Sequence, residues 1–594
     1  MNPPSVGLDS SWNGGLAMAL ENGLQWGRDI VFTYGPLGFM NGQGLWYSDL
    51  GVIAFAYGST LYIAFCIALV WALRRLVPAL PAVVIAFLVV TVLPLVEQSI
   101  VVAVLVCMRA LEGDRSERTV NALVVAGASF GAVEVLIKLS AGPVIATLFL
   151  IVLIGLRARW WQIVAYLALL AAEVLLLWLI AGQSLGAIPT FLRNTYEIVS
   201  GFSAAMVTTT DVPPWQVTVA TAAAVCVTLG LVLASTQGSY RDSRARWCGI
   251  VLMAQAAFTV FKEGVVRTDA GHLSLFFSTA CILWIAIPWA RARWYWMLAG
   301  AAVIVGIGWP VRPEGQTNNL DAIVNVRHAV DQARNLFSEG RRAELMAAGR
   351  TAMKSIYKLD PRTQAALRGH TVAIEPWEIG VAWAYRLDWD PLPVFQNYSA
   401  YTSRLDDLNA DAVSSPGGPE RILRENAGLV YPEFPTRSID SRFPGWDPPA
   451  QARAALCHFV VVRATERWQV LARAPDRCGP SRPIGSAEAS PGEAVQVPAP
   501  GRDEVVWARV DGVEVGGLER LVAFVAHART RHAIVNGTQS YRLIPGTASD
   551  GLMLRSSNHI GGQGAFAQIP QAKTIAVTGT DGDLRFSFYA MRVG

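Results

Sequence analysis

Residues 161–181 read WQIVAYLALLAAEVLLLWLIA, an apolar run whose one charged side chain is Glu173. A helix needs about 20 predominantly apolar residues to cross the hydrocarbon core of a bilayer. This run is long enough to do so, and the sequence on both sides repeats the pattern. We predict ten spans: residues 51–72, 80–95, 98–110, 119–136, 142–157, 161–181, 215–235, 247–261, 272–289 and 295–309.

The composition agrees with a polytopic α-helical membrane protein. Of the 594 residues, 53% are hydrophobic and 16% are charged, and the mean hydropathy is +0.36. The formal net charge of +4 is small for this length, so the basic face expected of a nucleic-acid-binding protein is missing. The 7 cysteines form no CxxC pair, so the zinc and redox motifs built on that spacing are absent.

The stretch 80–110 is too long for one straight span and short for two. Lys and Arg concentrate in cytoplasmic loops, and two spans here bring the arginine clusters to one side of the membrane. One span would scatter the clusters over both sides, so we expect a tight helical pair. The clusters are Arg74 and Arg75, residues 109–118, Arg157 and Arg159, residues 241–246, and Arg291 and Arg293.

Because successive spans cross the membrane in opposite directions, placing the arginine clusters inside puts four segments outside. These are residues 1–50, 182–214, 262–272, and everything after residue 310. Residues 1–50 follow no span in this sequence. We therefore expect a further span encoded upstream of Met1, and an upstream sequence without an apolar run would count against this expectation.

Six ionisable side chains lie in or at the ends of the predicted spans: Glu97, Glu134, Lys138, Glu173, Lys262 and Glu263. Such groups cost about 2.5–3.5 kcal/mol each at membrane depth on insertion scales, so they usually face a cavity or a partner. We expect an outward-facing polar cavity. The alternative is that some of them reach the interface or pair internally.

The predicted outer loop FKEGVVRTDAGH, residues 261–272, carries Lys262, Arg267, Asp269 and His272 within about a dozen positions. Arg binds phosphate oxygens bidentately and Lys acts as a point charge, so a lipid phosphate at headgroup level is the natural ligand. An ordinary charged turn is the alternative.

The N-terminal segment LDSSWNGGLAMALENGLQWGRDIVFTYGPLGFM, residues 8–40, predicts a short amphipathic helix and a glycine-rich aromatic turn. The helix pattern is carried by Trp12, Leu16, Leu20 and Leu24, and the turn by residues 32–38. Asp9 precedes the helix and Asp29 precedes the turn. An N-cap for a helix beginning near Ser11 is the alternative role of Asp9.

Beyond the spans, residues 311–485 predict an extracytoplasmic α/β domain that is helical up to about residue 370. The small and proline-rich stretch 479–502 predicts a linker. In residues 486–594, short runs of alternating apolar and polar residues are separated by turn signals, which predicts a jelly-roll-like β-sandwich. We expect that this domain is a candidate for carbohydrate binding. Cys457 and Cys478 flank a predicted hairpin, so we expect a disulfide, with two free thiols as the alternative.

This layout resembles the GT-C class of membrane glycosyltransferases, which take a sugar from a polyprenyl phosphate on the outer face. The motifs that carry the resemblance are LDSSW, FTYGPLGF and KEGVVRTDAGH, together with the outer loop 182–214 that contains Tyr196 and Glu197. The transmembrane core followed by a β-rich domain resembles the actinobacterial cell-wall arabinofuranosyltransferases in particular. The fold expected is therefore a GT-C-like core of residues 51–310, with residues 1–50 as the first extracytoplasmic catalytic loop.

The resemblance implies transfer of a sugar, with arabinofuranose as the candidate, to a cell-envelope glycan or protein acceptor outside a bacterial plasma membrane. It implies inversion at the donor carbon with Asp9 as general base. The expected ligands of the donor phosphate are Lys262, Arg267, Lys138 and His272. Supporting or acceptor-binding candidates are Asp29, Tyr34, Glu197, Glu263, Asp269, Gln396, Tyr398 and Tyr401, with Asn397 beside them.

No metal-ligand cluster stands out in the sequence, and the expected mechanism requires no metal, although some members of the class use a divalent cation. Two other functions fit a membrane protein of this plan. One is a transporter or lipid flippase with an outer sensory domain, although a transporter should have two repeated halves. The other is a glycan-binding scaffold without catalysis.

Overall fold

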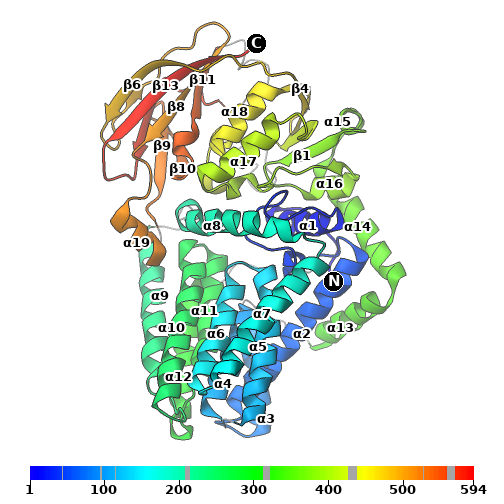
Figure 1. Cartoon of the computed structure of the whole chain (residues 1–594), viewed down its shortest axis with the longest axis vertical. Coiled ribbons are helices and arrows are strands. Elements are labelled where there is room, and N and C mark those ends of the chain that lie inside the picture. The colour runs from blue at the N-terminus through cyan, green and yellow to red at the C-terminus, as the bar shows by residue number, and fades with distance from the viewer. Residues whose placement is uncertain are drawn as a thin grey trace.

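The computed structural model describes residues 1–42, 44–93, 96–113, 116–207, 214–311, 322–425, 438–525, 528–557 and 569–594. Figure 1 shows a helical bundle at one end of the long axis, shorter helices in the middle, and a strand-rich region at the other end. The C-terminus lies in the strand-rich region, far from the bundle.

The bundle consists of helices that coincide with the ten predicted apolar runs. They are α2 (Ser48–Leu73), α3 (Ala79–Val92), α4 (Gln98–Glu112), α5 (Glu117–Ile137), α6 (Ala141–Gly155), α7 (Trp160–Ile180), α9 (Pro214–Ser235), α10 (Ser243–Val266), α11 (Ala270–Ala286) and α12 (Trp294–Gly308). Among the described residues, six are long and apolar enough to cross a membrane, namely α2, α5, α7, α9, α10 and α12 with its flanking turns. The chain is therefore a membrane protein with several candidate spans.

The bundle packs through small residues inside and exposes large apolar ones outside. A Cβ on Gly127 of α5 would lie 2.5 Å from the Phe149 ring of α6, and one on Gly142 would lie 2.3 Å from the backbone of Val135. Small residues let membrane helices approach this closely. Ile67 of α2 and Leu176 of α7 are exposed on the outer surface, as lipid-facing side chains should be.

Residues 80–110 form two helices, as predicted, and the two differ in environment. Of α3, Ala82 and Ala86 are the buried positions, whereas α4 is buried along most of its length. Pro94, which lies between the two helices in the sequence, is outside the described residues.

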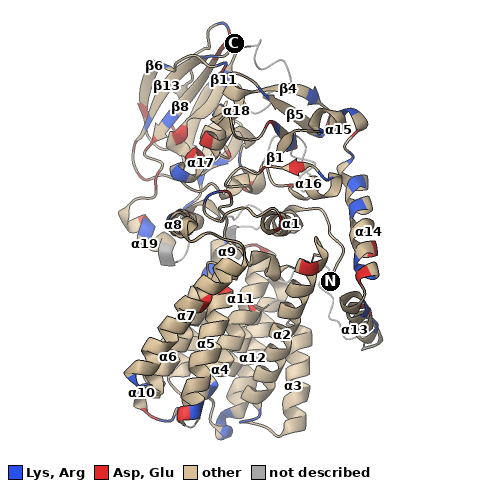
Figure 2. Cartoon of the chain, turned by 45° about the vertical axis from the view of Figure 1, so that its right-hand side comes forward, with Lys and Arg blue, Asp and Glu red and all other residues tan. Residues whose placement is uncertain are grey.

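The arginine clusters meet at the end of the bundle that points away from the strand-rich region (Figure 2). Arg75 forms an ion pair with Glu112 at 3.2 Å. Arg241 donates to the carbonyl of Gly113 at 3.4 Å, and Arg291 donates to the carbonyl of Arg75 at 2.9 Å. Loops from four parts of the sequence thus share one end, as the charge argument required.

The opposite end of the bundle carries the middle layer. Its helices are α1 (Leu8–Glu21), the short turn η1 (Gly38–Asn41), η2 (Leu185–Ala187) and α8 (Ile188–Ala205). Figure 1 shows α8 lying across the bundle rather than along it. The predicted N-terminal helix is present but ends at Glu21, so Leu24 lies beyond it.

The α/β region follows the bundle and includes a five-stranded sheet. Its helices are α13 (Ala322–Phe337), α14 (Glu339–Tyr357), α15 (Pro361–Leu367), α16 (Gly380–Tyr385), α17 (Ser403–Ser414) and α18 (Pro449–His458), with turns η5 (Asn397–Ser399), η6 (Ile439–Ser441) and η7 (Pro444–Trp446). Its strands are β1 (Thr371–Glu375), β2 (Asp388–Trp389), β3 (Arg421–Glu425), β4 (Phe459–Ala464) and β5 (Trp468–Arg473). The order is β2-β1-β3-β5-β4, parallel among β2, β1 and β3 and antiparallel at β5.

The C-terminal region contains two four-stranded antiparallel sheets with one shared core. The elements are β6 (Arg482–Ala489), β7 (Val495–Gln496), β8 (Glu504–Asp511), α19 (Gly517–Val525), β9 (Arg531–Val535), β10 (Gln539–Leu543), η8 (Ala548–Asp550), β11 (Leu552–Ser556), β12 (Thr574–Thr578) and β13 (Leu584–Arg592). The orders are β10-β9-β12-β7 and β11-β8-β13-β6. Phe586 and Phe588 of one sheet pack with Val535 and Ile575 of the other, because alternate residues of each strand face inward.

Two details of this region differ from the sequence prediction. The predicted linker 479–502 contains β6 and β7, so the predicted boundary at residue 486 falls inside β6. Pairing with the long strand β13 orders this small-residue stretch. The region also contains a helix, α19, between β8 and β9, where an all-β pattern was expected. Cys457 and Cys478 form a disulfide that spans the β4–β5 hairpin.

Candidate functional site

Asp9 lies in the first turn of α1, at the end of the bundle that faces the soluble regions. Its side chain is exposed, and its Oδ1 accepts a hydrogen bond from the Trp12 indole at 3.0 Å. The N-cap of α1 is Gly7, whose φ of 106° favours glycine. The alternative role of Asp9 as an N-cap is therefore wrong, because the helix begins at Leu8 and not near Ser11.

A buried carboxylate from the α/β region holds the start of α1. Glu378, which is fully buried, accepts hydrogen bonds at Oε2 from the Ser11 hydroxyl at 3.1 Å and the Tyr357 hydroxyl at 2.7 Å. The Gly7 amide donates to the same oxygen at 3.4 Å. An anion at a helix N-terminus is stabilised by the free amides and by the helix dipole. Glu378 therefore fixes the position of the helix that carries Asp9.

Aromatic side chains connect Asp9 to the interior of the site. The rings of Trp12 and Tyr34 stack with centroids 4.6 Å apart and an interplanar angle of 17°. Burial, together with nearby carboxylates that include Asp9, raises the pKa of Tyr34 to about 12 against the opposing effect of Lys138. Burial also raises the pKa of Tyr398, and Asp9 acts in the same direction. Asp9 thus lies within electrostatic reach of both tyrosines.

Lys138 forms an isolated backbone bridge with Tyr34. Its Nζ donates to Glu97 Oε1 at 2.6 Å and to Glu263 Oε1 at 2.8 Å. These three charges were expected to face an outward polar cavity, and they pair with one another instead: Glu97 precedes α4, Lys138 follows α5 and Glu263 lies on α10. Two carboxylates around one ammonium leave the group net negative if all three ionise, so Lys138 is not a free cation.

The two remaining acidic side chains of the predicted spans are hydrogen-bonded. Glu134 accepts a hydrogen bond from the Tyr57 hydroxyl, and Glu173 accepts one from Ser129 at 2.9 Å. Both carboxylates therefore have partners inside the bundle, which corresponds to the pairing alternative.

The predicted cationic loop is shorter than expected, because α10 continues to Val266 and α11 begins at Ala270. Asp269 is the N-cap of α11, and its carboxylate accepts from the amide of His272 at 3.0 Å and contacts His272 Nδ1 at 2.8 Å. Burial raises the pKa of Asp269, but the bonds to His272 and the charge of Arg267 outweigh it and hold the pKa at about 2.

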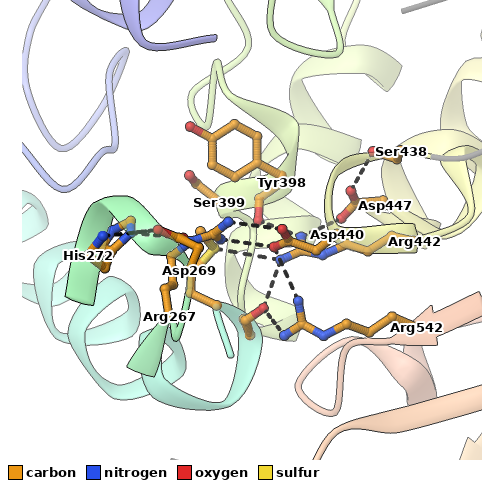
Figure 3. A network of polar contacts seen from close by, with 12 residues as sticks. Arg267, Asp269, His272, Tyr398, Ser399, Ser438, Asp440, Arg442, Asp447 and Arg542 are labelled. Carbon is orange, nitrogen blue, oxygen red and sulfur yellow. Dashed lines mark hydrogen bonds and ion pairs between the residues drawn. The ribbon is translucent and has the colours of Figure 1, made fainter. Parts of the chain in front are cut away.

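Arg267 belongs to an ion-pair network that joins three regions of the chain (Figure 3). Its two terminal nitrogens bind both oxygens of Asp440 at 3.0 Å each. Arg542 of β10 reaches the same carboxylate at 3.3 Å. Arg442 donates to Asp447 at 2.9 Å and, like Arg542, to the carbonyl of the last residue of α8. We refer to Arg267, Asp440, Arg442, Asp447 and Arg542 as the arginine junction.

The junction changes the interpretation of two expected phosphate ligands. Both terminal nitrogens of the Arg267 guanidinium already bind the Asp440 carboxylate. A phosphate would therefore have to displace Asp440. Lys262 donates to the carbonyl of Ala523 at 2.8 Å and to Ser203 Oγ at 3.2 Å. Both cations therefore hold the soluble regions on the bundle. Of the four expected ligands, His272 keeps the most accessible side chain, at 40%.

The remaining expected residues are dispersed. The Asp29 carboxylate accepts hydrogen bonds from the Arg28 side chain and from the amide of Gln25, and it thereby closes a turn. Glu197 is partly exposed on α8. In the α/β region, Gln396, Asn397, Tyr398 and Tyr401 are buried. Tyr398 and Tyr401 pack with α8 in an apolar cluster, so they do not offer an accessible face to an acceptor.

The described residues contain one group of side chains at metal-ligand spacing, Cys457, Asp476 and Cys478. Its two cysteines form the disulfide, so this group is not a metal centre. A small apolar cleft lies at the site end of α3, α11 and α12, lined by Leu93, Ser274, Phe277 and Trp309 among others.

Comparison with models of protein families, with curated proteins and with solved structures found no match to this chain.

Sequence reasoning missed Glu378, Asp440 and the aromatic contact between Trp12 and Tyr34. Glu378 and Asp440 occur in stretches without periodicity, so no local signal separates them from ordinary surface acids. The aromatic contact had a signal: Trp12 and Tyr34 both belong to the motifs quoted for the N-terminal segment.

Proposed function

We propose that the chain is a membrane glycosyltransferase of the GT-C type that transfers a sugar from a polyprenyl phosphate to a cell-envelope glycan or protein. The observation that carries this proposal is a series of contacts from an exposed carboxylate to a buried cation. Asp9 accepts a hydrogen bond from Trp12, Trp12 stacks on Tyr34, and the backbone of Tyr34 forms a bridge with the backbone of Lys138, the residue that carries the cation. An exposed acid and a cation at the same end of a membrane bundle suit an acceptor hydroxyl and a lipid phosphate.

In this mechanism the acceptor hydroxyl attacks the anomeric carbon of the donor while its proton passes to the Asp9 carboxylate. The new C–O bond forms as the bond between that carbon and the phosphate oxygen breaks, with inversion. The polyprenyl phosphate leaves as an anion and needs cationic stabilisation rather than a proton. His272 and Lys138 are the groups that we assign to it, and Lys138 would exchange one carboxylate partner for phosphate.

Arabinofuranose remains the candidate sugar by resemblance. A divalent cation is not needed by the steps above.

The C-terminal sheets support the acceptor half of the proposal. Their interleaved strand orders are those of a jelly roll, in which eight strands form two sheets, and lectin domains use this architecture. Because arginine clusters mark the cytoplasmic side, the soluble regions and Asp9 would face the outside of a bacterial plasma membrane.

The test is Asp9→Asn, assayed for transfer from a radiolabelled polyprenyl-phosphate sugar, with polyprenyl-phosphoarabinose as the first donor. We expect a loss of about 100-fold or more, the usual contribution of a general base. Asp49→Asn is the matched control, because Asp49 is also an exposed acid in the first turn of a helix. It should retain full activity.

Undiminished transfer by Asp9→Asn would remove Asp9 from its role. Absence of transfer by the wild-type chain with any donor, combined with glycan binding by the C-terminal region, would favour the scaffold. Donor movement across the bilayer without transfer would favour a flippase.

A further inference from the structure

Helix α19 interrupts the C-terminal sheets and has an apolar side that no described part of the chain covers. Leu518, Leu521 and Val522 are 79%, 60% and 50% exposed. Their spacing of three and four residues places them on one face of the helix. Scattered single apolar residues are common on protein surfaces, but three adjacent ones on one short helix need an explanation.

The other side of α19 is fixed to the protein by polar contacts. Glu519 binds Arg531 through both carboxylate oxygens at 2.5 Å and accepts from the amide of Arg529 at 3.1 Å. The carbonyl of Ala523 accepts from Lys262 Nζ of α10 at 2.8 Å. These contacts hold the helix in one orientation. The direction in which its apolar face points is therefore fixed by the fold.

The position of α19 identifies what covers that face. Figure 1 shows α19 beside the start of α9, at the end of the bundle where the soluble regions begin. α9 is a candidate span, and Trp215 and Val219 in its first turns are exposed. Trp and Tyr gather at the two membrane interfaces. The level of Trp215 is therefore the level of the lipid headgroups, and the bond from Lys262 near the end of α10 to Ala523 holds α19 at the same end of the bundle.

We propose that α19 is an interfacial membrane anchor, which inserts Leu518, Leu521 and Val522 into the leaflet nearest the soluble regions. Short amphipathic helices bind in this way, with the apolar face about 5–10 Å into the boundary between headgroups and acyl chains. The C-terminal sheets are thus tied to the bilayer itself as well as to α10. This assignment is independent of any catalytic activity.

A second protein is a weaker occupant on physical grounds. A stable protein–protein interface buries about 800 Å² on each partner, whereas this face consists of three described side chains next to a surface that already meets lipid. The face of α19 and the exposed first turns of α9 lie at the same end of the bundle, so a bilayer covers both without a new partner.

The experiment uses the full chain in phosphatidylcholine nanodiscs, with the fluorescent residue dansylalanine introduced by amber suppression at Leu521. Quenching is compared among discs with no spin label, with 5-doxyl lipid, and with aqueous iodide. We expect 5-doxyl lipid to quench the Leu521 probe at least about twofold more than the same probe at the control position, given the expected depth. A second probe at Val522 should behave in the same way.

Val462 is the matched control, since it is a 52% exposed apolar residue on β4, in the part of the molecule far from the bundle. Leu175, exposed on the candidate span α7, is the lipid-contact standard. Quenching of the Leu521 and Val522 probes by iodide and not by doxyl lipid would overturn the proposal. Protection from both quenchers would also overturn it, because a protein surface would then be the occupant.

Discussion

The two ends of the bundle both collect charged side chains, but they use them differently. At the arginine end several ion pairs are open to water, such as Arg159 with Glu117, whose side chains are largely exposed. At the site end the charges are mostly buried and join distant segments, as Arg267 and Asp440 do across 173 residues. Exposed charges of one sign set the orientation of a membrane protein, whereas buried charges need specific partners and fix how its parts dock.

The largest expected difference between the two ends is their accessibility from outside the cell. We expect a cysteine at Ala270, at the site end, to react with a membrane-impermeant maleimide in intact cells. A cysteine at Ser239, at the arginine end, should react after permeabilisation. Both positions are exposed. The native free cysteines to be replaced first are Cys66, Cys107, Cys226, Cys248 and Cys281. Equal labelling of both positions in intact cells would break the comparison.

The second prediction concerns the cost of removing a buried charge. Asp440→Ala leaves Arg267 and Arg542 without their shared carboxylate, so we expect a loss of about 3–5 kcal/mol in the free energy of unfolding. Asp581→Ala, which breaks the exposed pair with Arg529, should cost less than about 1 kcal/mol. Denaturant unfolding in detergent measures both.

The double variant Asp440→Ala with Arg267→Met should recover part of that loss, because it removes one of the unpaired charges. Equal destabilisation by the Asp440 and Asp581 variants would show that burial does not distinguish the two kinds of pair.

The third prediction concerns the positioning of α1. Glu378→Ala leaves the buried hydroxyls of Ser11 and Tyr357 without their acceptor, at a cost of about 1–3 kcal/mol. We expect faster hydrogen exchange in residues 8–21 and a lower transfer rate. Glu21→Ala, at the exposed C-terminal end of the same helix, is the control and should change neither. Unchanged exchange in the Glu378 variant would mean that apolar packing alone holds α1.

The smallest expected effect is a pH dependence at the start of α11. The folded pKa of Asp269 is about 2, below its ordinary value of 3.8. Its stabilising contribution is therefore present above about pH 4 and is lost as the pH falls through about 2. Asp269→Asn should be less stable than the wild type near neutral pH, and the difference between the two should shrink between pH 4 and pH 2. A difference that stays constant over this range would refute the assignment.

Helix positions were predictable here because a span is a local pattern. Residues 161–181 are recognisable without any other part of the chain, and the choice of two helices within 80–110 followed from counting arginines in loops. Internal pairing of charges at the span ends was one of two alternatives, but the sequence did not name Glu97 and Glu263 as the partners of Lys138. The C-terminal strands were predictable because apolar and polar residues alternate along them, as they do in β13.

The partners of these groups were not predictable, because they depend on contacts distant in sequence. Arg267 looked like a phosphate ligand in its own loop, and only the fold brings Asp440 to it. Tyr398 and Tyr401 were candidates for binding an acceptor, with packing in a core as the alternative, and only the fold shows that they pack with α8. The linker prediction was wrong for a related reason: the small residues of 482–489 become a strand because β13 is available to pair with them.

The arginine junction also constrains how the protein is made. The ribosome completes Arg267 before Asp440 exists, and Arg542 follows a further hundred positions along the chain. During synthesis, a finished membrane bundle must therefore keep the Arg267 guanidinium hydrated until the later segments cross the membrane and fold. A nascent chain that stops short of Asp440 would leave this cation with Asp269 of its own loop, at 3.4 Å, but without its bidentate partner at the bilayer surface.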